Sequence, residues 1–251
     1  MKKIAFISGA SSGFGEACAR QFAGAGYGLV LVARREARLA ALADELSKQV
    51  PVHWAQVDVR DRSALTECVA NLPEAFSAID VLINNAGLAL GTEPAQEADA
   101  SDWEVMVDTN IKGLMWLTHA VLPGMVARNR GHIINLGSTA GSWPYPGGNA
   151  YCGTKAFVEQ FTRGLRADLI GTRVRVGCIS PGMAETEFSQ VRMKGDEAKA
   201  NAVYAGTEPL TADDIAGIAL WMASCPPHVN VNALEVMPVC QAWGPLAVDR
   251  Q

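Results

Sequence analysis

A tyrosine and a lysine four residues apart form the pair best suited to proton transfer. Tyr151 and Lys155 lie in a segment with helical periodicity, so they share one face of the predicted helix. A phenol normally ionises at about pH 10, and a neighbouring ammonium lowers that pKa because it stabilises the phenolate. A phenol tuned in this way can donate a proton in a reduction and accept one in an oxidation. Because such a pair also arises by chance, other residues have to support this role.

A serine that follows a predicted strand is the second candidate. Ser138 comes just after the strand expected at 132–136. Functional residues of parallel sheets gather at the carboxyl ends of the strands, and a hydroxyl there can polarise a carbonyl oxygen. Stabilisation of a turn by the serine side chain is the alternative.

A glycine-rich loop joins the first predicted strand to the first predicted helix. Glycine lets the backbone approach a pyrophosphate closely, and the helix start offers free N–H groups and a positive dipole end. The spacing Gly-x3-Gly-x-Gly differs from the Gly-x-Gly-x-x-Gly fingerprint, so an ordinary turn is the alternative. The predicted coenzyme contacts in this loop are Gly9, Ser11, Ser12, Gly13, Phe14 and Gly15.

Two arginines at the end of the second predicted strand indicate which coenzyme is bound. An enzyme that prefers NAD usually has an acidic residue there for the ribose 2′-hydroxyl, but here Arg34 and Arg35 precede the first acid, Glu36. Guanidinium groups suit a 2′-phosphate, which predicts NADP and leaves open which arginine holds it. The alternative is that both arginines are simply exposed to solvent at the start of a helix, although cations there oppose the helix dipole.

Asp58 follows the third predicted strand. It could contact the edge of the adenine, or it could cap the helix that begins near Arg62.

Strand-like and helix-like segments alternate along the chain. The apolar runs are nearly continuous in Val, Ile and Leu, which is typical of parallel strands covered on both faces. Strands are predicted at 3–8, 28–33, 52–59, 79–83, 132–136, 174–179 and 233–236, and helices at 15–25, 35–48, 62–72, 101–128, 150–169 and 211–224. This alternation predicts an α/β fold of the Rossmann type, a doubly wound seven-stranded parallel sheet with helices on both faces.

Composition narrows the class of protein. The 251 residues are 49% hydrophobic and contain no linker or charge block, which predicts a single dinucleotide-binding and catalytic domain over 1–251. No uncharged apolar stretch reaches about 18 residues, so no membrane contact is expected. The net charge of −5 argues against nucleic acid as a partner. The six cysteines form no Cys-x-x-Cys pair, so we expect reduced thiols, a cytoplasmic protein and no metal site.

Several short motifs occur in a fixed order along nearly the whole chain. They are the glycine loop at 9–15, Asn-Asn-Ala-Gly at 84–87, Asn110, Ser138, Tyr151-x3-Lys155 and Pro181-Gly182. This ordered set resembles the short-chain dehydrogenase/reductase family. The resemblance implies an NADP(H)-dependent oxidoreductase that acts on CH–OH groups. Many NADP-preferring members carry a basic residue where this chain has Ser12, so the prediction of NADP rests on Arg34 and Arg35.

The resemblance also implies roles for the matching residues. Tyr151 exchanges the proton, Lys155 lowers its pKa and holds the nicotinamide ribose, and Ser138 binds the substrate oxygen. Asn110 holds a water that relays protons past Lys155. Further coenzyme contacts are expected from Val59, Asn85, Ala86, Gly87, Pro181, Gly182 and Thr186. From the residues alone, Asn110 could instead cap or kink its helix, and Thr186 could cap the helix that follows.

Three longer stretches, 84–91, 131–145 and 186–192, are similar to bacterial NADP-dependent 3-hydroxy acid dehydrogenases and to sulfoacetaldehyde reductases. The resemblance implies a small anionic aldehyde or ketone and its alcohol, a 3-hydroxy acid such as serine, allo-threonine or 3-hydroxypropionate. The alternative is sulfoacetaldehyde reduced to isethionate. The anion needs a partner, and we predict that the guanidinium of Arg192 binds it, with Lys194 as runner-up. An unpaired surface arginine is the alternative.

Two other readings of the chain stay open. A non-catalytic NADP-binding regulator could share the fold, although such a protein has no need of the set Ser138, Tyr151, Lys155 and Asn110. The second alternative is a reductase that acts on neutral carbonyl compounds.

Segments 101–128 and 150–169 are apolar beyond one face, which predicts burial against a partner chain. The resemblance implies a homotetramer built on these helices, with the segment near Trp243 at a contact.

Overall fold

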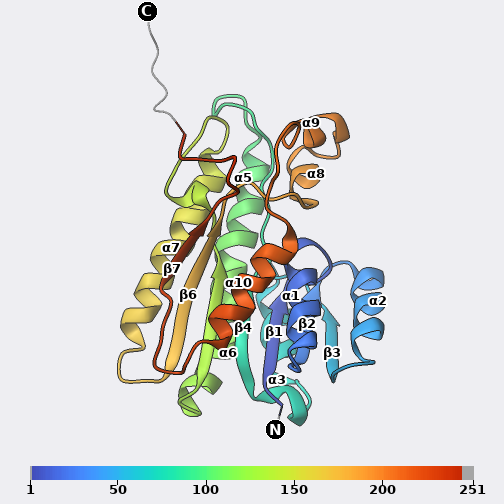
Figure 1. Cartoon of the computed structure of the whole chain (residues 1–251), viewed down its shortest axis with the longest axis vertical. Helices are drawn as coiled ribbons and strands as arrows, with labels where there is room; N and C mark the ends of the chain where they lie inside the picture. Colours follow the sequence, from blue (N-terminus) through green and yellow to red (C-terminus); the bar gives the residue numbers. More distant parts are fainter. Residues whose placement is uncertain (1, 245–251) are drawn as a thin grey trace, which may run out of the picture.

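Seven parallel strands form the sheet of the computed structural model, which describes residues 2–244 (Figure 1). The strand order is β3-β2-β1-β4-β5-β6-β7. The strands are β1 (Ile4–Ser8), β2 (Gly28–Ala33), β3 (Val52–Gln56), β4 (Ile79–Asn84), β5 (Gly131–Leu136), β6 (Val174–Pro181) and β7 (Ala233–Val236). All seven predicted strands are present, which confirms the doubly wound parallel sheet. β3 ends at Gln56 and not at residue 59, so residues 57–59 leave the sheet and line the cleft described below.

Helices cover both faces of the sheet. One layer contains α1 (Gly13–Gly24), α2 (Glu36–Leu46) and α10 (Ala212–Ser224), and the other contains α3 (Arg62–Ala70), α6 (Leu114–Ala127) and α7 (Asn149–Asp168). Within β1, Ala5 and Ile7 pack toward the first layer, whereas Ile4 and Phe6 pack toward the second. Successive strand residues point to opposite faces, so a strand covered on both faces has to be apolar throughout. Burial of each large apolar side chain contributes about 1.5–3 kcal/mol.

The long helix predicted at 101–128 is interrupted. α5 (Ala100–Val107) leads into a π-helical turn at Asp108–Gly113, and α6 follows directly. A π-turn inserts one extra residue into the helix and is frequent at functional sites. Hydrophobic spacing did not reveal it, because the apolar stripe continues on either side. The turn carries Asn110, whose side chain is buried.

Three short helices were not predicted. α4 (Glu74–Ser77), α8 (Phe188–Arg192) and α9 (Glu197–Ala202) have four to six residues each, too few to produce a periodic pattern. α8 and α9 belong to the segment 182–211 between β6 and α10, which we call the cover segment. Figure 1 shows α8 and α9 beyond the carboxyl ends of the strands, on the side of α2.

The strand order defines where a ligand can bind. β1 and β4 are neighbours, and the chain continues outward from them in opposite directions, through β2 and β3 on one side and β5 to β7 on the other. Ligands of such sheets bind in the crevice at this switch point, beyond the carboxyl ends of the strands. The loop after β1 and the residues after β4 therefore meet at one place.

Residues 2–244 lack two features that would indicate other classes of protein. In that part of the chain, no helix has the length and apolarity needed to cross a membrane. The same residues contain no cluster of three or more His, Cys, Asp or Glu side chains that could hold a metal ion. All six cysteines are free thiols, as the sequence predicted.

Candidate active site

A cleft of about 490 Å³ lies beyond the carboxyl ends of the central strands. This volume is within the range of about 300–1,000 Å³ that is usual for small-molecule and cofactor sites. Of the predicted site residues, only Gly15 and Asn110 do not line it. Both are buried against residues that do, Gly15 against Gly9 and Asn110 against Leu88. The sequence motifs therefore converge on a single site.

The glycine-rich loop forms a close-packed turn at the start of α1. Gly9 has φ +67°, a left-handed conformation that favours glycine. A Cβ atom added to Gly15 would lie 2.3 Å from the Gly9 carbonyl oxygen, so any other residue would displace the loop. Asn85 Nδ2 donates to the carbonyl oxygens of Ser8, at 2.9 Å, and Gly9, at 3.2 Å. α1 begins at Gly13, and its free N–H groups can bind an anion in the cleft.

The two arginines after β2 differ in their contacts. Arg35 Nε donates to Ser11 Oγ at 3.2 Å, Nη2 contacts Ser12 Oγ, and Nη1 donates to Glu187 Oε2 at 2.7 Å. These contacts overturn the alternative of a purely solvated arginine for Arg35. Arg34 is exposed at the cleft, and among the described residues its guanidinium makes no hydrogen bond. Arg34 is therefore the arginine with more donors available to a ligand.

Asp58 lines the cleft but does not cap the helix that follows. Arg60 donates to it through its backbone N–H, at 3.0 Å, and through its guanidinium, with Nη2 at 2.6 Å from Asp58 Oδ2. Burial raises the pKa of Asp58, but the hydrogen bonds from Arg60 outweigh burial and lower it below its usual value. The N-cap of α3 is instead Asp61, whose side chain accepts from Ala64 N at 3.0 Å. An ionised carboxylate at this edge accepts hydrogen bonds only.

The tyrosine and the lysine lie on the same face of α7, as their spacing predicted. Tyr151 is 8% exposed and Lys155 is 7% exposed, and the ammonium nitrogen lies 5.8 Å from the centre of the phenol ring. Lys155 Nζ donates to the Leu136 carbonyl oxygen at 2.8 Å, which fixes it beside the end of β5. Burial lowers the pKa of Lys155 to about 8, because the charged form is poorly solvated.

The pKa of Tyr151 is shifted upward, whereas the sequence predicted a downward shift. Burial raises the pKa of Tyr151 above its usual value, and the hydrogen bond with Ser138 and the charge of Arg192 lower it by less. The prediction that Lys155 would bring a net decrease was wrong for the protein alone, because desolvation of the phenolate dominates. At neutral pH Tyr151 is therefore a phenol, the form that can donate a proton to a carbonyl oxygen.

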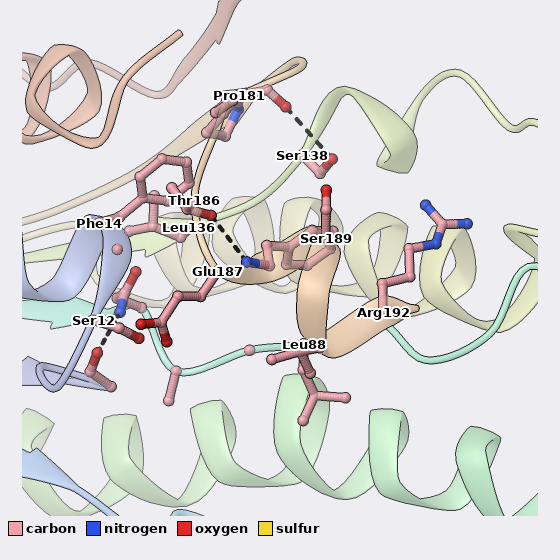
Figure 2. A pocket seen from close by; sticks show the side chains of 18 of the residues that line it. Ser12, Phe14, Leu88, Leu136, Ser138, Pro181, Thr186, Glu187, Ser189 and Arg192 are labelled. Carbon is pink, nitrogen blue, oxygen red and sulfur yellow. Dashed lines mark hydrogen bonds between the residues drawn. The ribbon is translucent and has the colours of Figure 1, made fainter. Parts of the chain in front are cut away.

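Ser138 has both of the roles that its position suggested. It is the N-cap of the 3₁₀ turn Thr139–Gly141, and its Oγ accepts from Ala140 N at 3.1 Å. The same hydroxyl donates to the Pro181 carbonyl oxygen at 3.5 Å and lines the cleft, as Tyr151 does. Figure 2 shows Ser138 at the end of the cleft that also holds Arg192. A carbonyl oxygen near Ser138 and Tyr151 would meet two hydroxyl donors.

Asn110 joins the floor of the cleft to α7. Its Oδ1 accepts from Leu88 N at 2.9 Å, and its Nδ2 donates to Leu88 O at 2.8 Å and to Thr154 Oγ1 at 3.0 Å. A Cβ atom on Gly87 would lie 3.3 Å from Asn110 Oδ1 and 3.5 Å from Lys155 Nζ, so a larger residue at this position would crowd both side chains. Asn110 lies in the π-turn and does not cap a helix, and its role with water stays a prediction.

The start of the cover segment closes one side of the cleft. Thr186 Oγ1 accepts from Phe188 N at 3.2 Å, so Thr186 stabilises the first turn of α8 and also lines the cleft. The Phe188 ring lies 5.5 Å from the Tyr151 ring, centre to centre. This contact contributes to the burial that raises the pKa of the phenol.

Arg192 ends α8 with its guanidinium in the cleft. Its Nη1 donates to Tyr145 Oη at 2.8 Å and its Nε donates to the Gly91 carbonyl oxygen at 3.2 Å, while Nη2 makes no hydrogen bond within residues 2–244. Lys194, the runner-up, does not line the cleft and pairs with Asp102 at 2.7 Å. The contacts of Arg192 fix its orientation and overturn the alternative of an unpaired surface arginine.

Sequence reasoning missed several residues that line the cleft. Glu187, Phe188 and Tyr204 belong to the cover segment, and Gln241 follows β7. Gln241 Oε1 accepts from Met183 N at 2.7 Å, across 58 residues of chain. No local pattern marks such residues, because their place in the cleft depends on how a long connection folds back over the sheet.

Comparison with known proteins agrees with this geometry. The model of the short chain dehydrogenase family matches residues 3–197. The chain is 56% identical over 251 residues to sulfoacetaldehyde reductase 2 of Chromohalobacter salexigens, with 100% of both chains covered. It is 53% identical over 249 residues to the NADP-dependent 3-hydroxy acid dehydrogenase YdfG of Escherichia coli K12, covering 99% of this chain and 100% of that protein.

A solved structure extends the agreement to three dimensions. The closed form of serine dehydrogenase complexed with NADP⁺ matches with a TM-score of 0.96 at 53% identity, covering 99% of this chain and 100% of that chain. Sequence and fold thus agree over essentially the whole length. The chain belongs to the short-chain dehydrogenase/reductase family.

Proposed function

We propose that this protein is an NADP(H)-dependent oxidoreductase that interconverts a small anionic aldehyde or ketone and its alcohol. The observation that carries the proposal is the convergence of Ser138, Tyr151, Lys155 and Arg192 on one cleft. The first three can bind and protonate a carbonyl oxygen, and the last can hold an anionic group nearby. NADPH, when bound, supplies the hydride.

The residues of this chain have distinct tasks in the proposed reaction. Ser138 orients the substrate oxygen, and Tyr151 donates the proton to it in the reduction and accepts it in the oxidation. Lys155 supports the proton transfer and would bind the nicotinamide ribose, while Asn110, which bonds Thr154 next to Lys155, holds the relay water. Tyr151 is buried and protonated at neutral pH, a state that favours the reduction.

The proposed coenzyme is NADP(H), bound along the glycine-rich loop. Arg34, exposed at the rim, is proposed as the main partner of the 2′-phosphate, with Arg35 beside it. The pyrophosphate contacts the amides of the loop and of α1, and Asp58 and Val59 contact the adenine. Asn85, Ala86 and Gly87 would line the adenosine side, and Pro181, Gly182 and Thr186 would lie at the nicotinamide end. The named NADP-dependent relative and the NADP⁺-bound structural neighbour support this assignment.

The relatives support two kinds of anionic substrate, one a carboxylate and the other a sulfonate. The relatives include a 3-hydroxy acid dehydrogenase and a sulfoacetaldehyde reductase, at 53% and 56% identity. A screen of NADPH oxidation with 3-oxo acids, sulfoacetaldehyde and neutral aldehydes tests the proposal, together with NADP⁺ reduction by serine, allo-threonine and 3-hydroxypropionate. Turnover of acidic substrates well above that of neutral ones supports it. NADPH binding without turnover of any carbonyl would identify a regulator and refute it.

The Arg192→Ala variant is expected to lose selectivity for acidic substrates. A hydrogen bond to a charged group contributes about 1.5–3 kcal/mol, so KM for an acidic aldehyde should rise about 10- to 100-fold, with little change for a neutral aldehyde. Steady-state kinetics on a matched pair of aldehydes measures this. Lys194→Ala is the control, since it removes a cation of the same segment that does not line the cleft. Equal losses for both aldehydes in Arg192→Ala would reject the anion site.

We infer that the chain forms one domain over 1–251 and assembles as a homotetramer in the cytoplasm. The exposed apolar side chains of α6, Met115 and Val126, support burial of this face against another copy. Trp243 is 58% exposed, and its ring lies 5.9 Å from the ring of Trp143, centre to centre, so the two together form an exposed aromatic surface that a second subunit could cover. Analytical ultracentrifugation tests the assembly, and a monomer at micromolar concentration would contradict it.

A further inference from the structure

A carboxylate lies on the same face of α7 as the tyrosine and the lysine of the proposed reaction. Glu159 follows Lys155 by four residues, as Lys155 follows Tyr151, so the three side chains stand one helical turn apart. Glu159 is partly buried and does not line the cleft. Its carboxylate therefore faces the elements that pack beside α7, and no step of the proposed reaction uses it.

Two serines from different elements donate to this carboxylate. Ser180 Oγ, on β6, donates to Glu159 Oε1 at 3.0 Å, and Ser142 Oγ, after the 3₁₀ turn, donates to Glu159 Oε2 at 3.2 Å. A Cβ atom added to Gly141 would lie 2.8 Å from Glu159 Oε1, so the backbone of the turn packs directly on the carboxylate. One side chain of α7 thus joins the helix to the turn and to the end of β6.

Both serines lie next to groups that hold the Ser138 hydroxyl. Ser142 is the C-cap of the 3₁₀ turn whose N-cap is Ser138. Ser180 precedes Pro181, whose carbonyl oxygen accepts from Ser138 Oγ at 3.5 Å (Figure 2). The Ser138 hydroxyl is therefore supported by its own turn and by the end of β6. Glu159 fastens both of these supports to α7.

The position of this turn on α7 determines where two catalytic hydroxyls meet. Ser138 belongs to the turn after β5, whereas Tyr151 belongs to α7, so the separation of their hydroxyls depends on how the turn sits on the helix. Lys155 Nζ, which donates to the Leu136 carbonyl oxygen at 2.8 Å, provides one attachment between the two elements. Glu159 provides a second, one helical turn further along. Reacting groups have to be held to within a fraction of an ångström, which makes such a second attachment important for the rate.

We propose that Glu159 is a positioning residue that fixes the Ser138 hydroxyl relative to the Tyr151 phenol. This inference rests on the proposed roles of these two residues in the reduction of a carbonyl group. Glu159 does not line the cleft, so it acts on the chemical step through Ser138 and not on the binding of NADPH.

The test is the single-turnover oxidation of bound NADPH by a saturating acidic aldehyde in Glu159→Ala, in Ser138→Ala and in the double variant. We expect Glu159→Ala to be about tenfold slower than the wild type, less than the roughly 100-fold loss that a displacement of about 1 Å can cause. Its Kd for NADPH should equal that of the wild type. In the Ser138→Ala background the same substitution should change the rate by less than about twofold, because coupled residues are not additive. A merely structural role would slow both backgrounds by the same factor.

A conservative variant separates the hydrogen bonds from the charge. In Glu159→Gln the amide oxygen can accept from one serine and the amide N–H can donate to the other, so about half or more of the wild-type rate should return. Ser142→Ala combined with Ser180→Ala removes the same two bonds while α7 stays unchanged, and it should slow the turnover as Glu159→Ala does. Asp168→Ala is the matched control, because it removes an exposed acid from the end of the same helix, away from the cleft. Its rate should equal that of the wild type.

The outcomes distinguish this inference from the proposed function. A wild-type rate in Glu159→Ala would overturn the inference, and so would equal losses with and without the Ser138 hydroxyl. A rate in Glu159→Gln as low as that of Glu159→Ala would also contradict it, since charge and not hydrogen bonding would then matter. Absence of carbonyl turnover in the wild type would instead refute the proposed function.

Discussion

The Tyr151→Phe variant is expected to bind NADPH as the wild type does and to reduce carbonyl substrates at least about 100-fold, and up to about 10,000-fold, more slowly. Phenylalanine keeps the ring that packs on Phe188 at 5.5 Å, so the cleft keeps its shape. The variant loses only the hydroxyl of a residue that lines the cleft together with Ser138. Without it, Ser138 can still bind the substrate oxygen, but no side chain of suitable pKa delivers the proton.

Single-turnover oxidation of bound NADPH, followed with a saturating acidic aldehyde, measures this loss apart from product release. Tyr27→Phe is the matched control, because Tyr27 is also buried, packs on Phe22 and lies outside the cleft. Its turnover should equal that of the wild type. Retention of most activity in Tyr151→Phe would mean that another group delivers the proton, and the assignment of Tyr151 would fail.

Many residues of the site could be predicted because their motifs come directly after predicted strands. The apolar run 28–33 gave no alternation, which indicated a strand covered on both faces, and β2 occupies the same residues. The glycine loop, Asn85, Ser138 and Pro181 each lie at or just after the end of a parallel strand. Because such ends share one edge of the sheet, their convergence on one cleft could be predicted.

Other features depend on tertiary packing and leave no local signal. The π-turn at Asp108–Gly113 changes which way Asn110 points without altering the apolar pattern around it. The burial that raises the pKa of Tyr151 comes partly from Phe188, in a helix too short to predict. The partner of Arg35 is a carboxylate 152 residues away, so the spacing of charges along the chain could not indicate the pair.

His132 shows a further consequence of packing, one that affects stability and not catalysis. It lies on β5 between Val81 of β4 and Arg175 of β6, is 1% exposed, and neither ring nitrogen has a hydrogen-bond partner. Burial, and then the charge of Arg175, lower the pKa of His132 to about 3. The folded protein therefore holds a neutral imidazole over the whole range in which an exposed histidine becomes protonated.

Proton uptake by His132 in the unfolded chain determines how the stability of the protein changes with pH. The unfolded chain binds a proton at His132 below a pH of about 6.5, and the folded chain does so only below about 3. Between these values the unfolded state carries more protons, so stability falls as pH falls, by about 1.4 kcal/mol for each pH unit. Above that range His132 adds no pH dependence. At pH 5.0 this residue alone should therefore destabilise the protein by about 2 kcal/mol relative to pH 7.5.

The His132→Leu variant is expected to lose this part of the pH dependence. Leucine is similar in size and leaves no unsatisfied nitrogen, so the variant should be at least as stable as the wild type at pH 7.5. Urea unfolding at pH 7.5 and 5.0, at one protein concentration, measures the change. The wild type should lose about 2 kcal/mol more than His132→Leu on acidification. His228→Gln, at an exposed histidine, should behave as the wild type does. Equal losses in the wild type and His132→Leu would show that His132 takes up its proton without unfolding, against the depressed pKa that its burial in the sheet requires.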